Sequence, residues 1–316
     1  MSLSETLFDL SLIVPCFNEE DNVQLFFDEV NRVFQNEKFT YEFIFVDDGS
    51  RDKTYLNLKK IYEDNPESNI QIISFSRNFG KEAAIYAGLS NTRGEKICLI
   101  DADLQQRPEV VLQMLDIMKN DEDIDCVAAY QETRKEGKIM SAVKSAFYKL
   151  INNVSDSDFK DGASDFRLFK KNVRDAILEM TEYHRFSKGL FGWVGFNTAY
   201  IPYTVEERAS GSSKWSAKKL LKYGLDGIIS FSTFPLKLAT YTGIISSFLS
   251  ILYLIIVVIQ KLVFGIDVPG YATIVVLLLF IGGVQLFCLG ILGEYLSKVY
   301  IEVKNRPVYL IKNHIK

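Results

Sequence analysis

The chain has 316 residues, a hydrophobic content of 48% and a net charge of −4, which allow one sizeable globular core and further apolar segments. The charge balance lacks the basic character that nucleic-acid binding requires, so we expect no nucleic acid among the partners. Four cysteines without metal-ligand spacing and only two histidines argue against a zinc site.

Residues 10–130 alternate strand-like and helix-like segments. Five short apolar runs, within LSLIVP, FIFVDDGS, IQIISFS, KICLIDAD and IDCVAA, are separated by helix-like stretches. In the first of these stretches five apolar residues share one helical face: Val23, Phe26, Phe27, Val30 and Phe34. This alternation predicts an α/β domain with a mainly parallel sheet and helices on both of its faces.

Polar clusters follow four of the predicted strands: Asn18–Glu19, Asp47–Asp48, Ser76–Asn78 and Asp101–Asp103. Ligands of such sheets bind beyond the carboxyl ends of the strands. We therefore expect the four clusters to converge on one site, although four unrelated strand ends that meet water would look the same in the sequence.

The stretch LIDADLQQRPE ends an apolar run with two carboxylates, Asp101 and Asp103. Neither a GxGxxG loop nor a GxxxxGK[ST] loop is present, so a bound nucleotide needs another counter-charge for its phosphates. A divalent cation, Mg²⁺ or Mn²⁺, held by these two carboxylates would supply that charge and remove their mutual repulsion. A strand end that meets water is the alternative for this motif taken alone.

Two long uncharged runs, residues 238–259 and 268–293, dominate the C-terminal part of the chain. Each exceeds the roughly 20 apolar residues that cross a bilayer as a helix, which predicts transmembrane helices at about 238–260 and 270–293. Lysines and arginines flank the pair of helices, whereas the loop between them contains only Lys261. This bias predicts a multi-pass protein of the cytoplasmic membrane, with the N-terminal domain and both termini in the cytoplasm. The N-terminal segment shows no signal-peptide pattern, which agrees with this expectation.

Between the N-terminal domain and the first uncharged run lies a segment in which apolar residues at helical spacing alternate with lysines. It predicts an amphipathic helix, either on the membrane surface or packed on the N-terminal domain. The expected organisation is an N-terminal domain (1–210), this segment (211–236), two transmembrane helices (237–297) and a cytoplasmic tail (298–316). Within the tail, EVKNRPVYLIKNHIK is expected to be a short extended segment.

Seven stretches in this order resemble glycosyltransferase family 2: VPCFNEE, FVDDGSRDKT, FSRNFGKEAA, DADLQQRPE, DFRLFKK, RFSKGLFGWVGF and ERASGSSKW. Within that family they resemble the polyprenyl-phosphate glycosyltransferases, which include dolichol-phosphate mannose synthases and bacterial undecaprenyl-phosphate glucosyltransferases. The resemblance covers nearly the whole chain. It implies a Rossmann-like GT-A fold and inverting transfer of a hexose from a nucleotide diphosphate sugar to a polyprenyl phosphate.

The resemblance also implies roles for individual residues. Those of the donor site would be Pro15, Phe17, Glu19, Val46, Asp48, Asp101, Ala102, Asp103, Gln105, Arg185, Arg208 and Lys214. Asp101 and Asp103 would be the metal ligands, and Asp103 and Asp165 the catalytic residues. Asp161 lies close enough in the sequence to compete with Asp165 for the acceptor-side role.

Two further expectations concern the charged residues near the site. Gln131 stands where relatives often carry an arginine, while Arg134 remains, so the resemblance gives Gln131 no phosphate-binding role. The acceptor is a phosphate monoester that is already anionic near neutral pH, because its second pKa is about 6. Asp165 could therefore orient a basic residue or hold the sugar as readily as it could act as a base.

Several alternatives stay open at this point. The nucleotide-sugar motifs also occur in processive polysaccharide synthases, although these usually have more membrane helices, and a membrane-anchored binding protein with a dead site is a non-enzymatic alternative. The resemblance favours UDP-glucose or UDP-N-acetylglucosamine as the donor and cell-envelope glycan modification as the purpose. We expect the lysines Lys218, Lys219 and Lys222 to attract the lipid phosphate. We also expect the chain to form a homo-oligomer.

Overall fold

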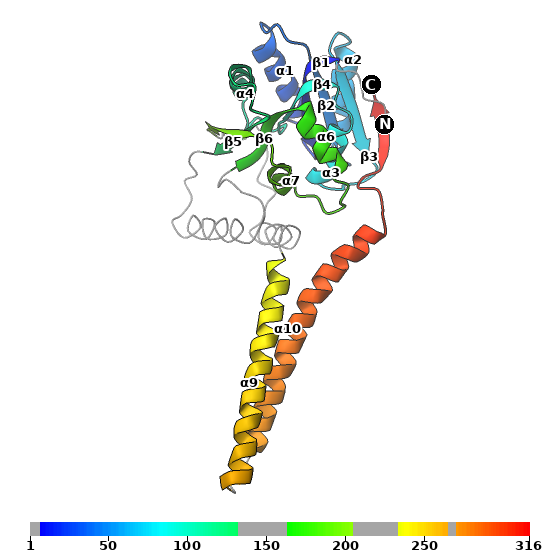
Figure 1. The fold of residues 1–316 in the computed structure, drawn as a ribbon. Coiled ribbons are helices and arrows are strands. Elements are labelled where there is room, and N and C mark those ends of the chain that lie inside the picture. Colours follow the sequence, from blue (N-terminus) through cyan, green and yellow to red (C-terminus); the bar gives the residue numbers. More distant parts are fainter. Residues whose placement is uncertain (1–6, 132–162, 205–232, 265–269) are drawn as a thin grey trace. The chain divides into compact units, whose positions relative to one another are not determined.

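The computed structural model describes residues 7–131, 163–204, 233–264 and 270–316. The chain divides into two compact units (Figure 1), of which the first comprises Met1–Tyr223 and Pro307–Lys316 and the second comprises Gly224–Arg306. Most of the predicted amphipathic segment 211–236 lies outside the described residues.

The first unit is built on one eight-stranded sheet with the order β7-β5-β6-β4-β1-β2-β3-β8. The strands are β1 (Phe8–Cys16), β2 (Tyr41–Asp47), β3 (Ile70–Phe75), β4 (Gly94–Leu99), β5 (Cys126–Gln131), β6 (Ala163–Lys170), β7 (Thr198–Tyr203) and β8 (Ile311–Ile315). Parallel pairs join β1 to β2 and β4, β2 to β3, and β5 to β7. Strand β6 runs antiparallel between β4 and β5, and β8 is antiparallel to β3. The predicted α/β fold with a mainly parallel sheet is confirmed.

Helices cover both faces of this sheet (Figure 1). Apolar side chains of α1 (Val23–Phe34), α2 (Thr54–Asp64) and α4 (Pro108–Asn120) pack into one core cluster, whereas α3 (Lys81–Leu89), α6 (Lys171–Glu179) and α7 (Ser187–Trp193) cover the other face. Alternation along β1 divides the core, because Leu12 and Val14 enter the first cluster and Ile13 enters one on the opposite face. The five apolar residues predicted to share a face of the first helix are all buried.

The C-terminal tail returns to the sheet of the first unit. Its strand β8 pairs with β3, with Ile73 opposite His314. The amide of Ser76 continues the contact beyond β3 by donating to the carbonyl of Leu310 at 3.0 Å. The tail is therefore extended, as expected, but it is also the eighth strand of the sheet, which the sequence did not indicate.

The second unit contains two long helices, α9 (Phe234–Phe264) and α10 (Tyr271–Val303). Both are long and apolar enough to cross a membrane, with mean hydropathies of 2.5 and 2.7 over their candidate spans. No residue in the most apolar window of either helix is buried within the structure. Apolar helices without protein cover have the composition that lipid requires, rather than that of soluble core helices.

Candidate active site

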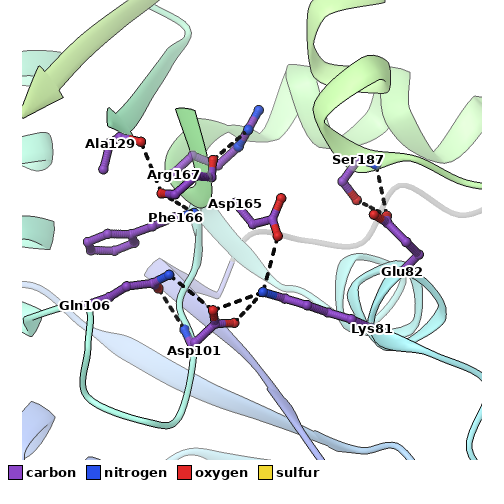
Figure 2. Close-up of polar contacts among 10 residues, drawn as sticks. Lys81, Glu82, Asp101, Gln106, Ala129, Asp165, Phe166, Arg167 and Ser187 are labelled. Atoms are coloured by element: carbon purple, nitrogen blue, oxygen red, sulfur yellow. Dashed lines mark hydrogen bonds and ion pairs between the residues drawn. The ribbon is translucent and has the colours of Figure 1, made fainter. Parts of the chain in front are cut away.

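The loop after β4 fixes the two carboxylates of the DAD motif. Gln106 accepts from the amide of Asp101 at 2.9 Å and donates from Nε2 to Oδ2 of the same residue at 3.2 Å (Figure 2). Asp103 is buried, and its Oδ1 accepts from the amide of Gln105 at 3.2 Å. Leu104 turns the chain between them in the left-handed region, with φ at +57°. The loop therefore holds both aspartates through its own backbone and side chains.

Lys81 joins the carboxylates of two distant segments (Figure 2). Its Nζ lies 2.7 Å from Oδ1 of Asp101 and 3.2 Å from Oδ2 of Asp165, which lies on β6. Pro15 and Phe166 line the same pocket as these three side chains. The structure thus brings together Asp101, Asp165 and Pro15, which the sequence singled out, with a lysine that it did not. The sequence contained one indication of this lysine. It begins a helix rich in small residues, directly after a predicted strand and its polar turn.

The charges around Asp165 keep it ionised. Burial by itself would raise the pKa of this carboxyl, but Lys81, followed by Lys188 and Arg167, holds the pKa well below its usual range. Its Oδ1 is buried and has no hydrogen-bond partner among the described residues. A carboxylate with a low pKa is a weak proton acceptor, so this environment favours an orienting or electrostatic role.

Glu82 connects the start of α3 to the start of α7. Its carboxylate accepts from the amide of Ser187 at 2.9 Å and from the hydroxyl of the same residue (Figure 2). Burial, and then the nearby charge of Asp165, raises the pKa of Glu82. Burial lowers the pKa of the neighbouring Lys188, while Asp165 opposes that effect. The α3–α7 contact therefore places a second lysine in the electrostatic environment of Asp165.

Arg167 lies on β6, two residues after Asp165, and is also buried. Its guanidinium donates to the carbonyl of Ser164 at 3.0 Å, and its central carbon lies 4.1 Å from the ring centroid of Phe191. This residue supports β6 from within the fold and contributes positive charge to the surroundings of Asp165.

Asp48, which directly follows β2, organises the turn that precedes Lys81. Its two carboxylate oxygens accept from the amides of Phe79 at 2.6 Å and Gly80 at 2.9 Å. Burial raises the pKa of Asp48 to about 6, although both amide hydrogen bonds lower it. Gly49 follows with φ at +63°, and a Cβ there would lie 2.4 Å from the carbonyl carbon of Arg77. Only glycine fits this close approach of the two loops.

The remaining donor-site predictions fall on β1, β2 and their loops. Glu19 accepts from Asn22 at 2.5 Å, and its amide donates to Thr54 at 2.8 Å. Val46 and Ala102 are buried in the core clusters, so their side chains pack inside the fold. Phe17 is half-buried in the loop after β1. Their contact with a nucleotide stays a prediction.

In the structure Arg185 contacts backbone carbonyls and an aromatic ring, and its contact with a diphosphate stays a prediction. It is buried, and it donates to the carbonyl of Ile177 at 3.3 Å and to that of Met180, near the C-terminal end of α6. Its guanidinium carbon lies 4.2 Å from the ring centroid of Tyr86. In this structure the guanidinium therefore donates to carbonyls at the C-terminus of a helix, where unpaired carbonyls favour a cation.

Other predicted residues lie outside the described part of the chain: Arg134, Asp161, Arg208, Lys214, Lys218, Lys219 and Lys222. Gln131 is described and ends β5. Within the described ranges no group of three acidic, histidine or cysteine side chains is arranged to hold a metal ion. Two carboxylates nevertheless fit Mg²⁺ or Mn²⁺, which commonly complete their coordination with substrate phosphate and water. The ammonium group beside Asp101 shows that this position favours positive charge.

The sequence similarities identify the family. Residues 11–178 match the profile described as Glycosyl transferase family 2. The chain belongs to this family. Residues 234–299 match the GtrB C-terminal hairpin, so the two helices of the second unit form a hairpin of that type. As a member of this family, the chain is a glycosyltransferase.

Relatives match over nearly their full length. The uncharacterized glycosyltransferase sll0501 of Synechocystis sp. is 42% identical over 306 residues, which cover 96% of this chain and 95% of the relative. The SfII prophage-derived bactoprenol glucosyl transferase of Shigella flexneri is 40% identical over 304 residues, with 96% and 97% covered. Among solved structures, glucosyl-3-phosphoglycerate synthase of Mycobacterium tuberculosis, with Mn²⁺, UDP and glucosyl-3-phosphoglycerate, has a TM-score of 0.49 at 16% identity. That match covers 70% of this chain and 78% of the synthase.

Proposed function

We propose that this glycosyltransferase transfers a glucosyl residue from UDP-glucose to undecaprenyl phosphate, with inversion, at the cytoplasmic face of a membrane. The observation that carries the proposal is the meeting of Asp101 and Asp165 at the ammonium group of Lys81. One carboxylate lies in a diphosphate-type motif on the loop after β4 and the other lies on β6, and together they would provide a donor side and an acceptor side in one pocket. The bactoprenol glucosyl transferases among the relatives support the choice of sugar and lipid.

The donor side would consist of the loops after β1, β2 and β4. Asp101 and Asp103 would hold a divalent cation, which neutralises the departing nucleotide diphosphate when bound. Asp48 would accept from the nucleoside, and Lys81 would contribute fixed positive charge beside the diphosphate. Asp103 is buried and accepts from the amide of Gln105, which supports this arrangement because it limits how far that carboxylate can move.

The acceptor side would be organised by Asp165. The lipid phosphate is already anionic, so its attack on the sugar needs an aligned oxygen more than a strong base. Lys188 and Arg167, which lower the pKa of Asp165 together with Lys81, would also offset the repulsion between that carboxylate and an approaching phosphate. A single displacement from the face opposite the diphosphate would invert the anomeric centre.

The apolar hairpin would keep the enzyme at the bilayer, where a polyprenyl chain is confined. The two helices α9 and α10 have the length and composition for this role. A cytoplasmic catalytic domain and a homo-oligomer remain our predictions from the sequence.

The test is transfer from radiolabelled UDP- and GDP-sugars to undecaprenyl phosphate by the full chain in detergent, with Mg²⁺, Mn²⁺ or a chelator. We expect one metal-dependent glucosyl lipid, with the anomeric configuration opposite to that of the donor. Asp165→Asn should abolish most of the product, whereas Asp28→Asn, an exposed site on α1, should not. Nucleotide-sugar binding without a lipid product would refute the assignment of the acceptor.

A further inference from the structure

The C-terminal tail packs against the face of the catalytic sheet that α3 covers. Pro307–Lys316 belongs to the first unit, and three residues, 304–306, separate it from the last residue of α10. Val308 and Tyr309 pack on a buried cluster that includes Val46, Phe75 and residues of α3. The tail also lies outside both of the ranges that match family profiles.

Tyr309 is the centre of an aromatic group on this face. Its ring stacks on Phe75 with centroids 4.9 Å apart and an interplanar angle of 15°. It also meets Tyr86 of α3 edge-on at 6.2 Å. Phe79 in turn packs edge-on against Phe75 at 5.8 Å. One tail residue thus supports the ring against which the turn after β3 is packed.

That turn, residues 76–80, has little other apolar support. Ser76, Arg77 and Asn78 are exposed, and a Cβ at Gly80 would meet no atom within 4 Å. Phe79 is its half-buried apolar member. The amides of Phe79 and Gly80 are the groups that bind Asp48, and the next residue is Lys81.

We propose that Tyr309 is a positioning residue, and that the C-terminal tail holds the turn 76–80 in the shape that presents Asp48 and Lys81 to the donor. Tyr309 would support the turn through two packed ring pairs, Tyr309 on Phe75 and Phe75 on Phe79. The consequence for the donor rests on the proposed function, whereas the consequence for the turn does not. The chain that leaves the membrane hairpin thereby becomes part of the catalytic unit.

The test compares four variants of the full chain in detergent. Tyr309→Ala removes the stacked ring, while Tyr309→Phe keeps the ring and removes the hydroxyl that hydrogen-bonds Ser90. Lys312→Ala changes an exposed residue of the same tail. Leu58→Ala opens the core on the opposite face of the sheet, and so controls for general destabilisation.

The first readout is amide hydrogen exchange of peptides that cover residues 76–81, measured without any ligand. We expect Tyr309→Ala to accelerate their exchange about two- to tenfold, as loss of one aromatic pair predicts. Tyr309→Phe and Lys312→Ala should leave it at the wild-type value. Leu58→Ala should accelerate exchange in α2 without selecting this turn. Unchanged exchange of the turn in Tyr309→Ala would overturn the proposal.

The second readout is the binding of UDP with Mn²⁺ by calorimetry. The Kd should rise in Tyr309→Ala by a factor similar to that in exchange, because binding must then close an open turn. If the turn loosens but UDP affinity is unchanged, the proposed link to the donor is refuted. If the wild type itself does not bind UDP, the choice of donor nucleotide is wrong, and the exchange result still decides the structural role of Tyr309.

Discussion

Replacing Lys81 by methionine would remove the cation that Asp101 and Asp165 share. The methionine keeps most of the side-chain volume, so the change is chiefly one of charge. An exposed ion pair contributes about 0–1 kcal/mol, and removing one partner of a buried pair costs about 3–5 kcal/mol. The side chains of Lys81, Asp101 and Asp165 are 38%, 31% and 20% exposed, so they lie between these limits. We therefore expect Lys81→Met to lower the free energy of unfolding by roughly 1–3 kcal/mol.

Thermal unfolding in detergent, followed by intrinsic fluorescence, measures this loss. The Tm of a unit of this size changes by about 2–4 °C for each kcal/mol of stability lost, so the Tm should fall by about 2–12 °C. The matched control is Lys59→Met, which breaks an exposed pair with Glu63 at 3.4 Å and should cost no more than about 0.5 kcal/mol.

Added Mn²⁺ gives the same reasoning a second test. The carboxylates of Asp101 and Asp165, left without the ammonium group, should attract a divalent ion more strongly than in the wild type. Mn²⁺ should consequently raise the Tm of Lys81→Met by more than it raises that of the wild type. Equal shifts in both proteins, or a Tm of Lys81→Met equal to that of Lys59→Met, would refute the view that Lys81 balances these carboxylates.

Three further predictions concern other parts of the site. Asp165→Asn should lower kcat by about 10²–10³-fold with a smaller effect on the KM of the donor, and steady-state kinetics showing an unchanged kcat would contradict the acceptor-side role. The pKa of Asp48 is raised from 3.8 to about 6, so the folded state keeps a proton that the unfolded state loses between these values. Stability should therefore fall as pH rises through that window, by on the order of 3 kcal/mol, and urea unfolding at pH 4.5 and 7 should show a smaller fall in Asp48→Asn. Gly49→Ala should lower the Tm more than Gly80→Ala. Both positions have positive φ, but only at Gly49 would the added Cβ clash with a neighbouring backbone. Equal losses of Tm would mean that backbone strain alone sets the cost of both substitutions.

Patterns that depend on neighbours in the sequence could be predicted well. The five buried residues of α1 share a face because helical periodicity alone places them there. The two hairpin helices are evident from the length of their uncharged runs. Asp101 and Asp103 follow a buried strand, and strand ends of a parallel sheet are where ligands bind.

Contacts that depend on the order of strands could not be predicted. Lys81, Asp101 and Asp165 come from α3, the end of β4 and β6, and no local pattern states that β6 lies antiparallel beside β4. The sequence shows that Arg185 carries a positive charge, but it could not show that the guanidinium donates to carbonyls at the end of α6.

The sequence by itself therefore determined the class of fold, the membrane-type hairpin and the acidic motif, because each follows from composition or from periodicity over a few turns. Tertiary structure alone decided which cation stands between the carboxylates and where the tail ends. Four residues of β8 pair with β3, more than two hundred positions earlier in the chain, because the edge of β3 offers unpaired backbone groups and an apolar face that Tyr309 can cover.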